Sequence, residues 1–444
     1  MPNAVNASLT DGDFEKIFSA KKTSKECVSG ETNTSRVKTR IVYLIAFLDL
    51  FAASMLTPLL RQRILDSGIG YTGAGFIGSI YAFCQLFSGP VLGDWSDHYG
   101  RGRVMFISIL LSSLGYFLLA PSNSVVVICV SRTICGCFKH TQTLCKAFLA
   151  DLDTEDDRHS RRKKDDEAEI SNEHTQSTGT DGGRFGPFMT ISTLGFVFGP
   201  IIGGHISEHE GGFEVVASIV AAMFLVNALL VGKYLSGTRR QSHMTKKEAA
   251  SSKSSLWTVM KDNADIFLVQ FLVSLSVMVI RTNYIQYVQE NFGVSIKWAG
   301  YLTGYQAMLG VIGAMCLSTS IMKWYHRPAA LMLHATIALG ISLSGIAFTR
   351  SFPIYVLCLT ILNFVSPFSR MANMNQILDR AKSPEHHGSL MGTHQSIGSC
   401  ARLSSSVVSG VAQDLISPKY GSEVVSIACI AIAVGQLLSL KPTA

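Results

Sequence analysis

The sequence predicts an all-α membrane protein with twelve transmembrane helices in two six-helix bundles. Of the 444 residues, 48% are apolar and only 16% are charged. Average soluble domains carry about 25% charged residues, so the deficit indicates a membrane protein. Twelve apolar stretches then follow one another with short links, each near the roughly 20 residues that a helix needs to cross a bilayer.

These stretches define the expected spans. Several contain one polar residue, and it is their regular succession that indicates a multi-pass protein. The spans are expected at about 40–60, 73–92, 104–120, 124–148, 186–206, 213–233, 264–287, 299–321, 328–349, 353–377, 388–410 and 422–440.

Polar segments divide the chain into domains. Residues 1–36 have no sustained apolar run and predict a disordered cytoplasmic tail. The first bundle is expected over 37–235, with a cytoplasmic insertion at 151–185. The insertion is interpreted as a solvated loop, with a regulatory or partner-binding segment as the alternative. Residues 236–262 predict a cytoplasmic linker, and 263–444 predict the second bundle.

Lysine and arginine predict the orientation. With the amino terminus inside, 27 of the 38 basic residues fall on the inner side, five fall outside and six lie within spans. This distribution satisfies the positive-inside rule and places both termini in the cytoplasm. The net charge of +7 is thus explained by topology, so we expect a lipid bilayer as partner and no nucleic acid. The plasma membrane and an intracellular organelle membrane both stay open, and we expect a monomer.

Cysteine usage and the motifs present exclude several other classes. The ten cysteines are scattered and mostly lie in apolar runs, which fits neither a disulfide framework nor a zinc site. Cys135 and Cys137 with His140 suggest a metal only weakly, and helix packing is the simpler interpretation. There is no nucleotide-binding loop and no nucleophile elbow. We therefore expect no metal, no cofactor, no primary pump and no enzyme.

The turn from Gly93 to Arg103 resembles a family signature. It is short and charged, and Asp97 and Arg101 are four residues apart, the spacing of a local ion pair. Gly93 is expected to allow close helix approach, and Gly100 to take a positive φ. The pattern G-x-x-x-D-x-x-G-R resembles the loop between the second and third helices of the major facilitator superfamily. The resemblance implies that Gly93, Asp97, Gly100 and Arg101 form a cytoplasmic latch between two halves of a transporter.

The fifth span carries a second family-like pattern. Small residues four apart allow helix backbones to touch, and a proline bends a helix. The pattern G-x-x-x-G-P-x-x-G-G resembles the fifth-helix motif of facilitator antiporters in the tetracycline-exporter branch. The residues concerned are Gly195, Gly199, Pro200, Gly203 and Gly204.

The fourth span carries three cations. Arg132, Lys139 and Lys146 recur every seven residues and would form one stripe on a continuous helix. Lys146 lies close enough to the inner end to reach the headgroups. Charges deep in a bilayer are costly, so Arg132 and Lys139 should face a water-filled cavity or a partner. Asp49, the one acid found deep in a span, is the natural counter-ion of either and a candidate protonation site. The family's arginine at the position of Arg132 is associated with proton coupling.

The second half supplies further cavity candidates. Arg281, Arg370 and Arg402 lie within spans seven, ten and eleven, and Gln395 shares a face with Arg402 beside His394. Asn363, Asn373 and Asn375 make the tenth span polar, and some of these groups are expected only to join helices. Tyr305 and Gln306 in the eighth span are either solute donors or packing residues.

The charge balance predicts the solute. Six cations face one acid within the spans, which favours a solute with a carboxylate, sulfate or phosphate. Our first hypothesis is a secondary-active transporter of a small anionic or zwitterionic organic solute by alternating access, either passive or coupled to protons in antiport. A facilitator-fold receptor or regulator that transports nothing is the alternative.

Overall fold

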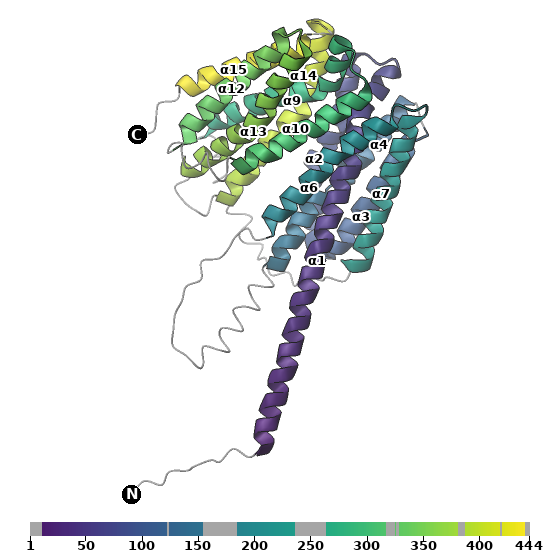
Figure 1. Cartoon of the computed structure of the whole chain (residues 1–444), viewed down its shortest axis with the longest axis vertical. Helices are drawn as coiled ribbons and strands as arrows, with labels where there is room; N and C mark the ends of the chain where they lie inside the picture. Colours follow the sequence, from purple (N-terminus) through teal and green to yellow (C-terminus); the bar gives the residue numbers. More distant parts are fainter. Residues whose placement is uncertain are drawn as a thin grey trace.

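The computed structural model describes residues 11–121, 124–153, 184–235, 263–316, 325, 328–380, 387–417 and 420–439. The predicted linker 236–262 and most of the predicted insertion 151–185 lie outside these residues. The helices form two bundles, α1 to α7 and α9 to α15 (Figure 1). Their bounds are α1 Asp11–Asp66, α2 Tyr71–Tyr99, α3 Arg101–Leu119, α4 Val125–Phe138, α6 Phe185–Ile206, α7 Gly212–Tyr234, α9 Ala264–Phe292, α10 Ile296–Cys316, α12 Pro328–Phe348, α13 Phe352–Arg380, α14 His387–Leu415 and α15 Gly421–Ser439.

The spans lie where the apolar stretches predict them. Within the described residues, nine helices are long and apolar enough to cross a membrane. The exceptions are α4, which is short because its span is interrupted and continues as residues 141–153, and α10 and α14, which are rich in glycine or polar residues. The predicted fold class, twelve transmembrane helices in two bundles, is confirmed.

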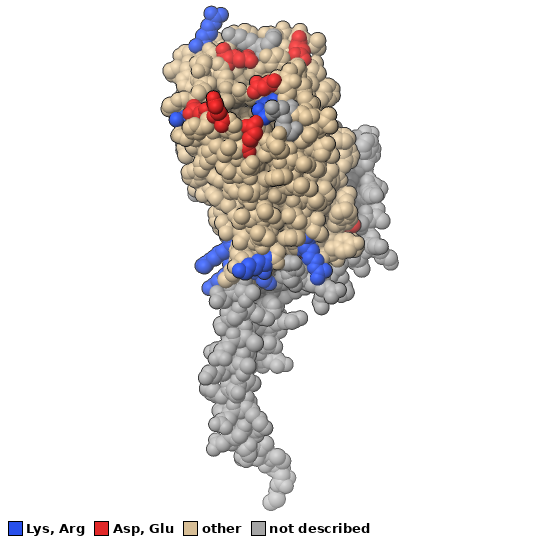
Figure 2. Space-filling view, turned by 90° about the vertical axis from the view of Figure 1, so that its right-hand side faces the viewer, with Lys and Arg blue, Asp and Glu red and all other residues tan. Residues whose placement is uncertain are grey.

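The surface carries the charge distribution of a membrane protein. Figure 2 shows a broad belt without charged side chains, with Lys and Arg along the edge below it and Asp and Glu mostly above it. Large apolar side chains such as Phe117 and Leu229, each 61% exposed, lie in the helices of this belt. Exposed apolar area on this scale requires lipid around it.

The amino-terminal segment differs from the prediction. α1 already begins at Asp11, so residues 11–36 are helical rather than a disordered tail. The segment contains no proline and several helix-forming Lys and Glu residues, so the helix of the first span extends through it. Its first part runs out beyond the bundle (Figure 1).

Each bundle has an apolar core of its own. Met105, Phe188 and Phe224 are fully buried in the first core, and Leu339 and Tyr355 are buried in the second. Because each half is packed around its own centre, the two halves form separate bodies with an interface between them.

Close packing of α6 on α1 depends on glycine. A Cβ on Gly195 would lie 2.6 Å from the Phe47 carbonyl oxygen, and Gly199 and Gly203 face the backbone of α1 as tightly. Gly204 lies on another side of α6, where a Cβ would be 3.1 Å from the Ile296 carbonyl oxygen at the start of α10. The glycines of the fifth span therefore sit both within the first bundle and at its contact with the second.

Candidate functional site

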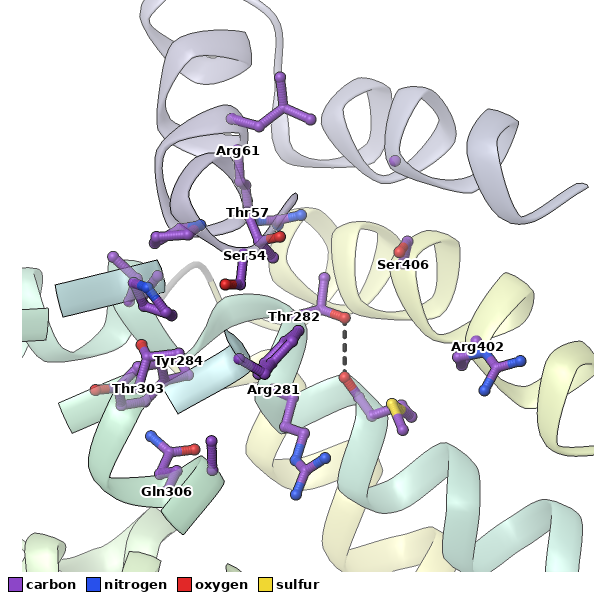
Figure 3. A pocket seen from close by; sticks show the side chains of 18 of the residues that line it. Ser54, Thr57, Arg61, Arg281, Thr282, Tyr284, Thr303, Gln306, Arg402 and Ser406 are labelled. Carbon is purple, nitrogen blue, oxygen red and sulfur yellow. Dashed lines mark hydrogen bonds between the residues drawn. The ribbon is translucent and has the colours of Figure 1, made fainter. Parts of the chain in front are cut away.

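A cavity of about 1380 Å³ lies between the two bundles. The first bundle lines it with residues of α1, α2 and α6, and the second with residues of α9, α10, α13 and α14 (Figure 3). Its volume exceeds the roughly 300–1,000 Å³ of pockets that hold drug-sized ligands. The cavity can therefore hold such a molecule together with water.

The bundles are joined at one end of the cavity, which we call the closed end, where α2 begins and α14 ends. There the Asp414 carboxylate accepts a hydrogen bond from the Thr72 backbone N–H at 2.9 Å. Arg61 donates to Gln413 at 2.8 Å. Glu208 after α6 accepts a hydrogen bond from the Ser295 hydroxyl at 3.0 Å. Each of these contacts joins one bundle to the other.

The opposite end, where α6 begins and α10 ends, is called the open end. Met189 and Thr190 of α6 line one side of the cavity there, and Ala314 and Met315 of α10 line the other. The two bundles converge toward the closed end and diverge toward this one (Figure 1). The cavity therefore separates the two bundles at the open end, away from the closed-end contacts described above.

Three of the predicted cavity residues line this space. Arg281 of α9, Arg370 of α13 and Arg402 of α14 all belong to the cavity wall and are exposed to it. Arg281 donates to the Asn363 side-chain oxygen at 2.8 Å, and Arg402 donates to the Ser399 hydroxyl at 2.7 Å. Within the described part of the chain, none of the three arginines forms an ion pair.

The charges of these arginines act on one another. Arg370 lies within electrostatic range of both Arg281 and Arg402. The acids in the cavity wall are Asp66, the last residue of α1, and Glu290, near the end of α9. Both acids lie at the closed end, so the arginine wall of the second bundle carries an excess of positive charge.

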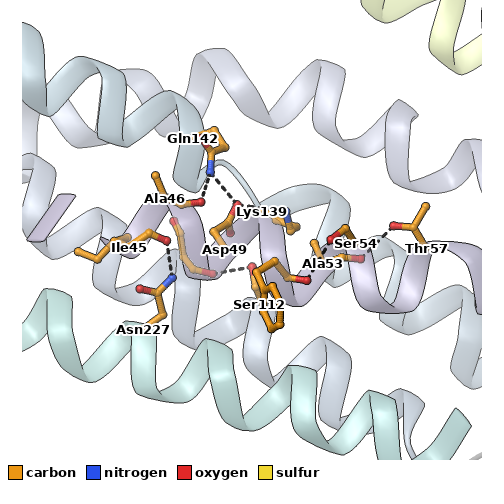
Figure 4. A network of polar contacts seen from close by, with 12 residues as sticks. Ile45, Ala46, Asp49, Ala53, Ser54, Thr57, Ser112, Lys139, Gln142 and Asn227 are labelled. Atoms are coloured by element: carbon orange, nitrogen blue, oxygen red, sulfur yellow. Dashed lines mark hydrogen bonds and ion pairs between the residues drawn. The ribbon is translucent and has the colours of Figure 1, made fainter. Parts of the chain in front are cut away.

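Four predicted cavity residues do not line this cavity: Asp49, Arg132, Lys139 and Gln395. The first three are buried in the first bundle instead. Asp49 is 1% exposed, and its carboxylate is 3.3 Å from the Lys139 ammonium, so Lys139 is its counter-ion (Figure 4). Gln142 donates to the same carboxylate oxygen at 3.3 Å and to the Ala46 carbonyl at 2.9 Å. Lys139 and Gln142 of span four are thus turned toward α1 rather than toward the cavity.

Arg132 lies one layer behind the cavity wall. Its guanidinium carbon is 6.0 Å from the ring centre of Tyr81 and 5.9 Å from that of Tyr116. Tyr81 itself lines the cavity. The Nε and Nη2 atoms of Arg132 are buried without a hydrogen-bond partner among the described residues. Tyr81 therefore separates the buried charges of the first bundle from the cavity.

The fourth span is broken at Lys139, against the continuous helix assumed from the seven-residue spacing. α4 ends at Phe138, and Lys139 has φ −77° and ψ 72°. The His140 N–H donates to the Phe138 carbonyl at 2.8 Å, which is an inverse γ-turn. Gln85 of α2 donates to the Lys139 carbonyl at 3.1 Å and satisfies a group that the break releases. Arg132, Lys139 and Lys146 consequently do not share one helical stripe.

The predicted latch residues lie at the open end. Arg101 is 3.0 Å from Asp97 and 2.5 Å from Asp151 at the end of the fourth span, and it donates to Ser96 at 3.1 Å. Gly100 has φ 95° between α2 and α3, a conformation that favours glycine. Arg101 thus ties the second, third and fourth spans together within the first bundle.

Gly93 does not have the expected role in helix approach. A Cβ at this position would meet nothing within 4 Å among the described residues. Its carbonyl accepts a hydrogen bond from Ser96 at 2.7 Å. Gly93 lies within α2, and no other described helix approaches it closely.

Other polar residues separate into lining and packing groups. Gln306 lines the cavity, whereas the Tyr305 hydroxyl is 3.0 Å from Thr360 and joins α10 to α13. Asn363 holds Arg281, and Asn373 donates to the Ile266 carbonyl at 3.3 Å. The described residues hold no cluster of three metal-binding side chains.

Three residues of the site are not indicated by the sequence. Arg61 was placed outside the first span because the apolar stretch ends at Leu60, but α1 continues to Asp66 and Arg61 lines the cavity. Glu423 is, with Asp49, one of two buried acids within the described spans and is 4% exposed. Asp414 caps α2 across the bundles, a pairing between residues far apart in the chain that no local pattern indicates.

A membrane protein of two helical bundles with a central cavity has the architecture of a secondary transporter. Residues 42–161 and 177–406 match the model of the Major Facilitator Superfamily, and the chain belongs to this family. It is an integral multi-pass membrane protein that handles a small-molecule solute, not an enzyme.

Individual relatives agree with this assignment. The chain is 26% identical over 305 residues to the class B tetracycline resistance protein of Escherichia coli, covering 66% of this chain and 69% of that protein. It is 32% identical over 141 residues to Major facilitator superfamily domain-containing protein 10 of Mus musculus, covering 25% of this chain and 31% of that protein.

Solved structures share the fold. The crystal structure of the human organic anion transporter MFSD10 aligns with a TM-score of 0.61 at 19% identity, over 91% of this chain and 99% of that one. The nucleoside transporter NupG aligns with a TM-score of 0.70 at 12% identity, over 90% of this chain and 97% of that one. At these identities the likeness concerns the fold.

Proposed function

We propose that this transporter moves an anionic organic solute by alternating access. The observation that carries the proposal is the wall of Arg281, Arg370 and Arg402, which come from three helices of one bundle and face the same cavity. Arg281 and Arg402 donate hydrogen bonds to neutral groups, and no acid among the described residues pairs with any of the three arginines. A partly desolvated cavity with unpaired guanidinium groups favours a negatively charged solute.

The cavity is open toward the cytoplasm in this proposal. The open end carries the Gly93–Arg103 turn and the start of α6, which the positive-inside rule assigns to the cytoplasmic side together with both termini. The structure would then represent the inward-facing state, and the contacts of Thr72, Arg61 and Glu208 would form the external gate. The external gate must break, and the latch region must meet the second bundle, for the solute to cross.

The Asp49–Lys139 pair is the proposed coupling site for protons. Asp49 is the one buried acid among the described residues of the first bundle, and Tyr81 of the cavity wall lies next to Arg132 in the same buried group of charges. Protonation of Asp49 would release Lys139, whose backbone lies at the helix break. The break supplies a position at which the two parts of span four can reorient.

Transport into liposomes tests the proposal. The purified protein is reconstituted and uptake is measured for a panel of organic anions, with organic cations of similar size as comparison. We expect anion uptake by the wild type and its loss in Arg370→Gln, because this variant removes a cavity charge. Arg350→Gln is the matched control, since Arg350 is exposed in the link between α12 and α13.

Coupling is tested in the same vesicles with an imposed pH gradient. We expect the gradient to drive uptake by the wild type but not by Asp49→Asn, which should still exchange solute across equal pH. Uptake of cations alone would contradict the anion assignment. No movement of any solute by protein that remains folded would favour the receptor or regulator instead.

A further inference from the structure

The cavity has two unlike walls. The second bundle presents Arg281, Arg370 and Arg402, together with Gln306. The first bundle presents hydroxyl, aromatic and aliphatic side chains along α1 and α6, including Thr57, Met189, Thr193 and Phe196. The one cation that the first bundle adds is Arg61, which is held by Gln413 at the closed end. The arginines therefore face a largely uncharged surface across the cavity.

The arginines also form a group rather than three separate charges. Arg370 is within electrostatic range of Arg281 on one side and of Arg402 on the other. Each of the hydrogen bonds from Arg281 and Arg402 uses a single Nη2 atom, so the remaining N–H groups can donate to a ligand. Three like charges in one wall repel each other, and a single negative charge would relieve only part of that repulsion.

We propose that the solute carries two negative charges on one end and an apolar body on the other. The doubly charged end would bind the arginine wall of the second bundle, and the body would lie against α6 near Phe196. Phosphate monoesters and dicarboxylates attached to an apolar or aromatic group have this chemistry. This inference rests on the proposed function, because it specifies the solute of the same cavity.

A matched pair of ligands separates the second charge from every other property. 4-Methylumbelliferyl phosphate and 4-methylumbelliferyl sulfate share one aromatic body and nearly the same shape. The phosphate ester approaches two negative charges above its second pKa of about 6, whereas the sulfate ester carries one. Binding of both esters to the purified full-length transporter is measured by ligand-induced thermal stabilisation and by competition in uptake.

The phosphate ester should bind at pH 7.5 about tenfold more tightly than the sulfate ester, the gain that an additional charge-assisted hydrogen bond gives. Lowering the pH to about 5 should remove most of this preference, because the phosphate then loses its second charge. His394 lies within electrostatic range of Arg370. The sulfate ester reports any change due to His394, since its own charge is constant.

Variants of the transporter test separately how the charged end and the apolar body of the ligand are bound. Arg370→Gln should reduce the preference for the phosphate ester to less than about threefold, and Arg281→Gln gives a second test of the same wall. Phe196→Ala should weaken both esters by the same factor, because it removes contact with the shared body. The matched controls are Arg350→Gln and Phe198→Ala, since Phe198 is 49% exposed and does not line the cavity.

Equal affinity of the two esters for the wild type would overturn the inference. So would a preference for the phosphate ester that survives both arginine variants. Failure of both esters to bind, while other organic anions are transported, would reject this inference and leave the proposed function standing. Failure of every anion to bind or move would reject both.

Discussion

Removing the charge of Asp49 tests the buried ion pair of the first bundle. Asp49→Asn keeps the shape of the side chain and leaves an oxygen to accept the hydrogen bond from Gln142. It leaves Lys139, which is 9% exposed, without its counter-ion. Across 3.3 Å the attraction in the pair is about 5 kcal/mol at an effective dielectric constant of about 20. Removing one partner of such a pair destabilises a protein by about 3–5 kcal/mol.

The assay is thermal unfolding of the purified protein in detergent. At about 2–4 °C per kcal/mol for a bundle of this size, we expect Asp49→Asn to lower the melting temperature by about 10 °C. Asp66→Asn is the control, because Asp66 ends the same helix and is exposed. The double variant Asp49→Asn with Lys139→Met should recover most of the loss, since it removes the unpaired charge. A melting temperature of Asp49→Asn within about 2 °C of the wild type would contradict the stabilisation attributed to the Asp49–Lys139 pair.

Three further variants test separate contacts. Gly195→Leu should prevent α6 from packing on α1 and strongly reduce the yield of folded protein in size-exclusion chromatography. Gly186→Leu should not, because no described atom lies within 4 Å of a Cβ at that position. Arg101→Ala should lower the melting temperature by about 4–8 °C, because it removes two partly exposed ion pairs that contribute about 1 kcal/mol each. Asp414→Ala removes a helix cap that contributes about 0.5–2 kcal/mol. It should raise by about two- to thirtyfold the population of molecules in which the two bundles have separated at the closed end, as measured by spin-label distances across that end. Asp414→Asn should change this population less, since asparagine also caps; an equal effect of both variants would contradict the capping role.

Much of the fold could be predicted because lipid imposes a simple rule on sequence. Each spanning helix must be apolar over most of its length, and the links between helices are short and polar, so both can be found without knowing any contact. The observed helix ends differ from the predicted ones where polar residues continue a helix beyond its apolar stretch. Arg61 is the clearest case, because α1 continues past Leu60 to Asp66.

The break in span four could not be predicted from local sequence. Phe138, Lys139 and His140 include neither glycine nor proline, and Lys is a good helix former. The break is supported from outside the segment by Gln85 and Ser88 of α2, which donate to the backbone carbonyls of Lys139 and Gly136. Such support depends on how two helices pack and leaves no periodic signal.

The division of the deep charges between cavity and bundle interior was equally hidden. The sequence identifies polar residues in apolar spans, but it does not say whether they face the other bundle or their own. Asp49 and Lys139 are paired inside the first bundle, whereas Arg281, Arg370 and Arg402 face the space between the bundles. Periodicity assigns residues to a face of a helix, and only the packing of helices decides what that face contacts.

Hydroxyl-radical footprinting of the wild-type protein in lipid nanodiscs tests most directly that the space between the bundles contains water. Met189 and Met315, 51% and 60% exposed, line the cavity, whereas Met308 is 43% exposed but does not line it and faces the surface of α10. We expect rapid oxidation of Met189 and Met315 and protection of Met308 by lipid. Protection of all three methionines to the same extent would mean that water does not enter between the two bundles.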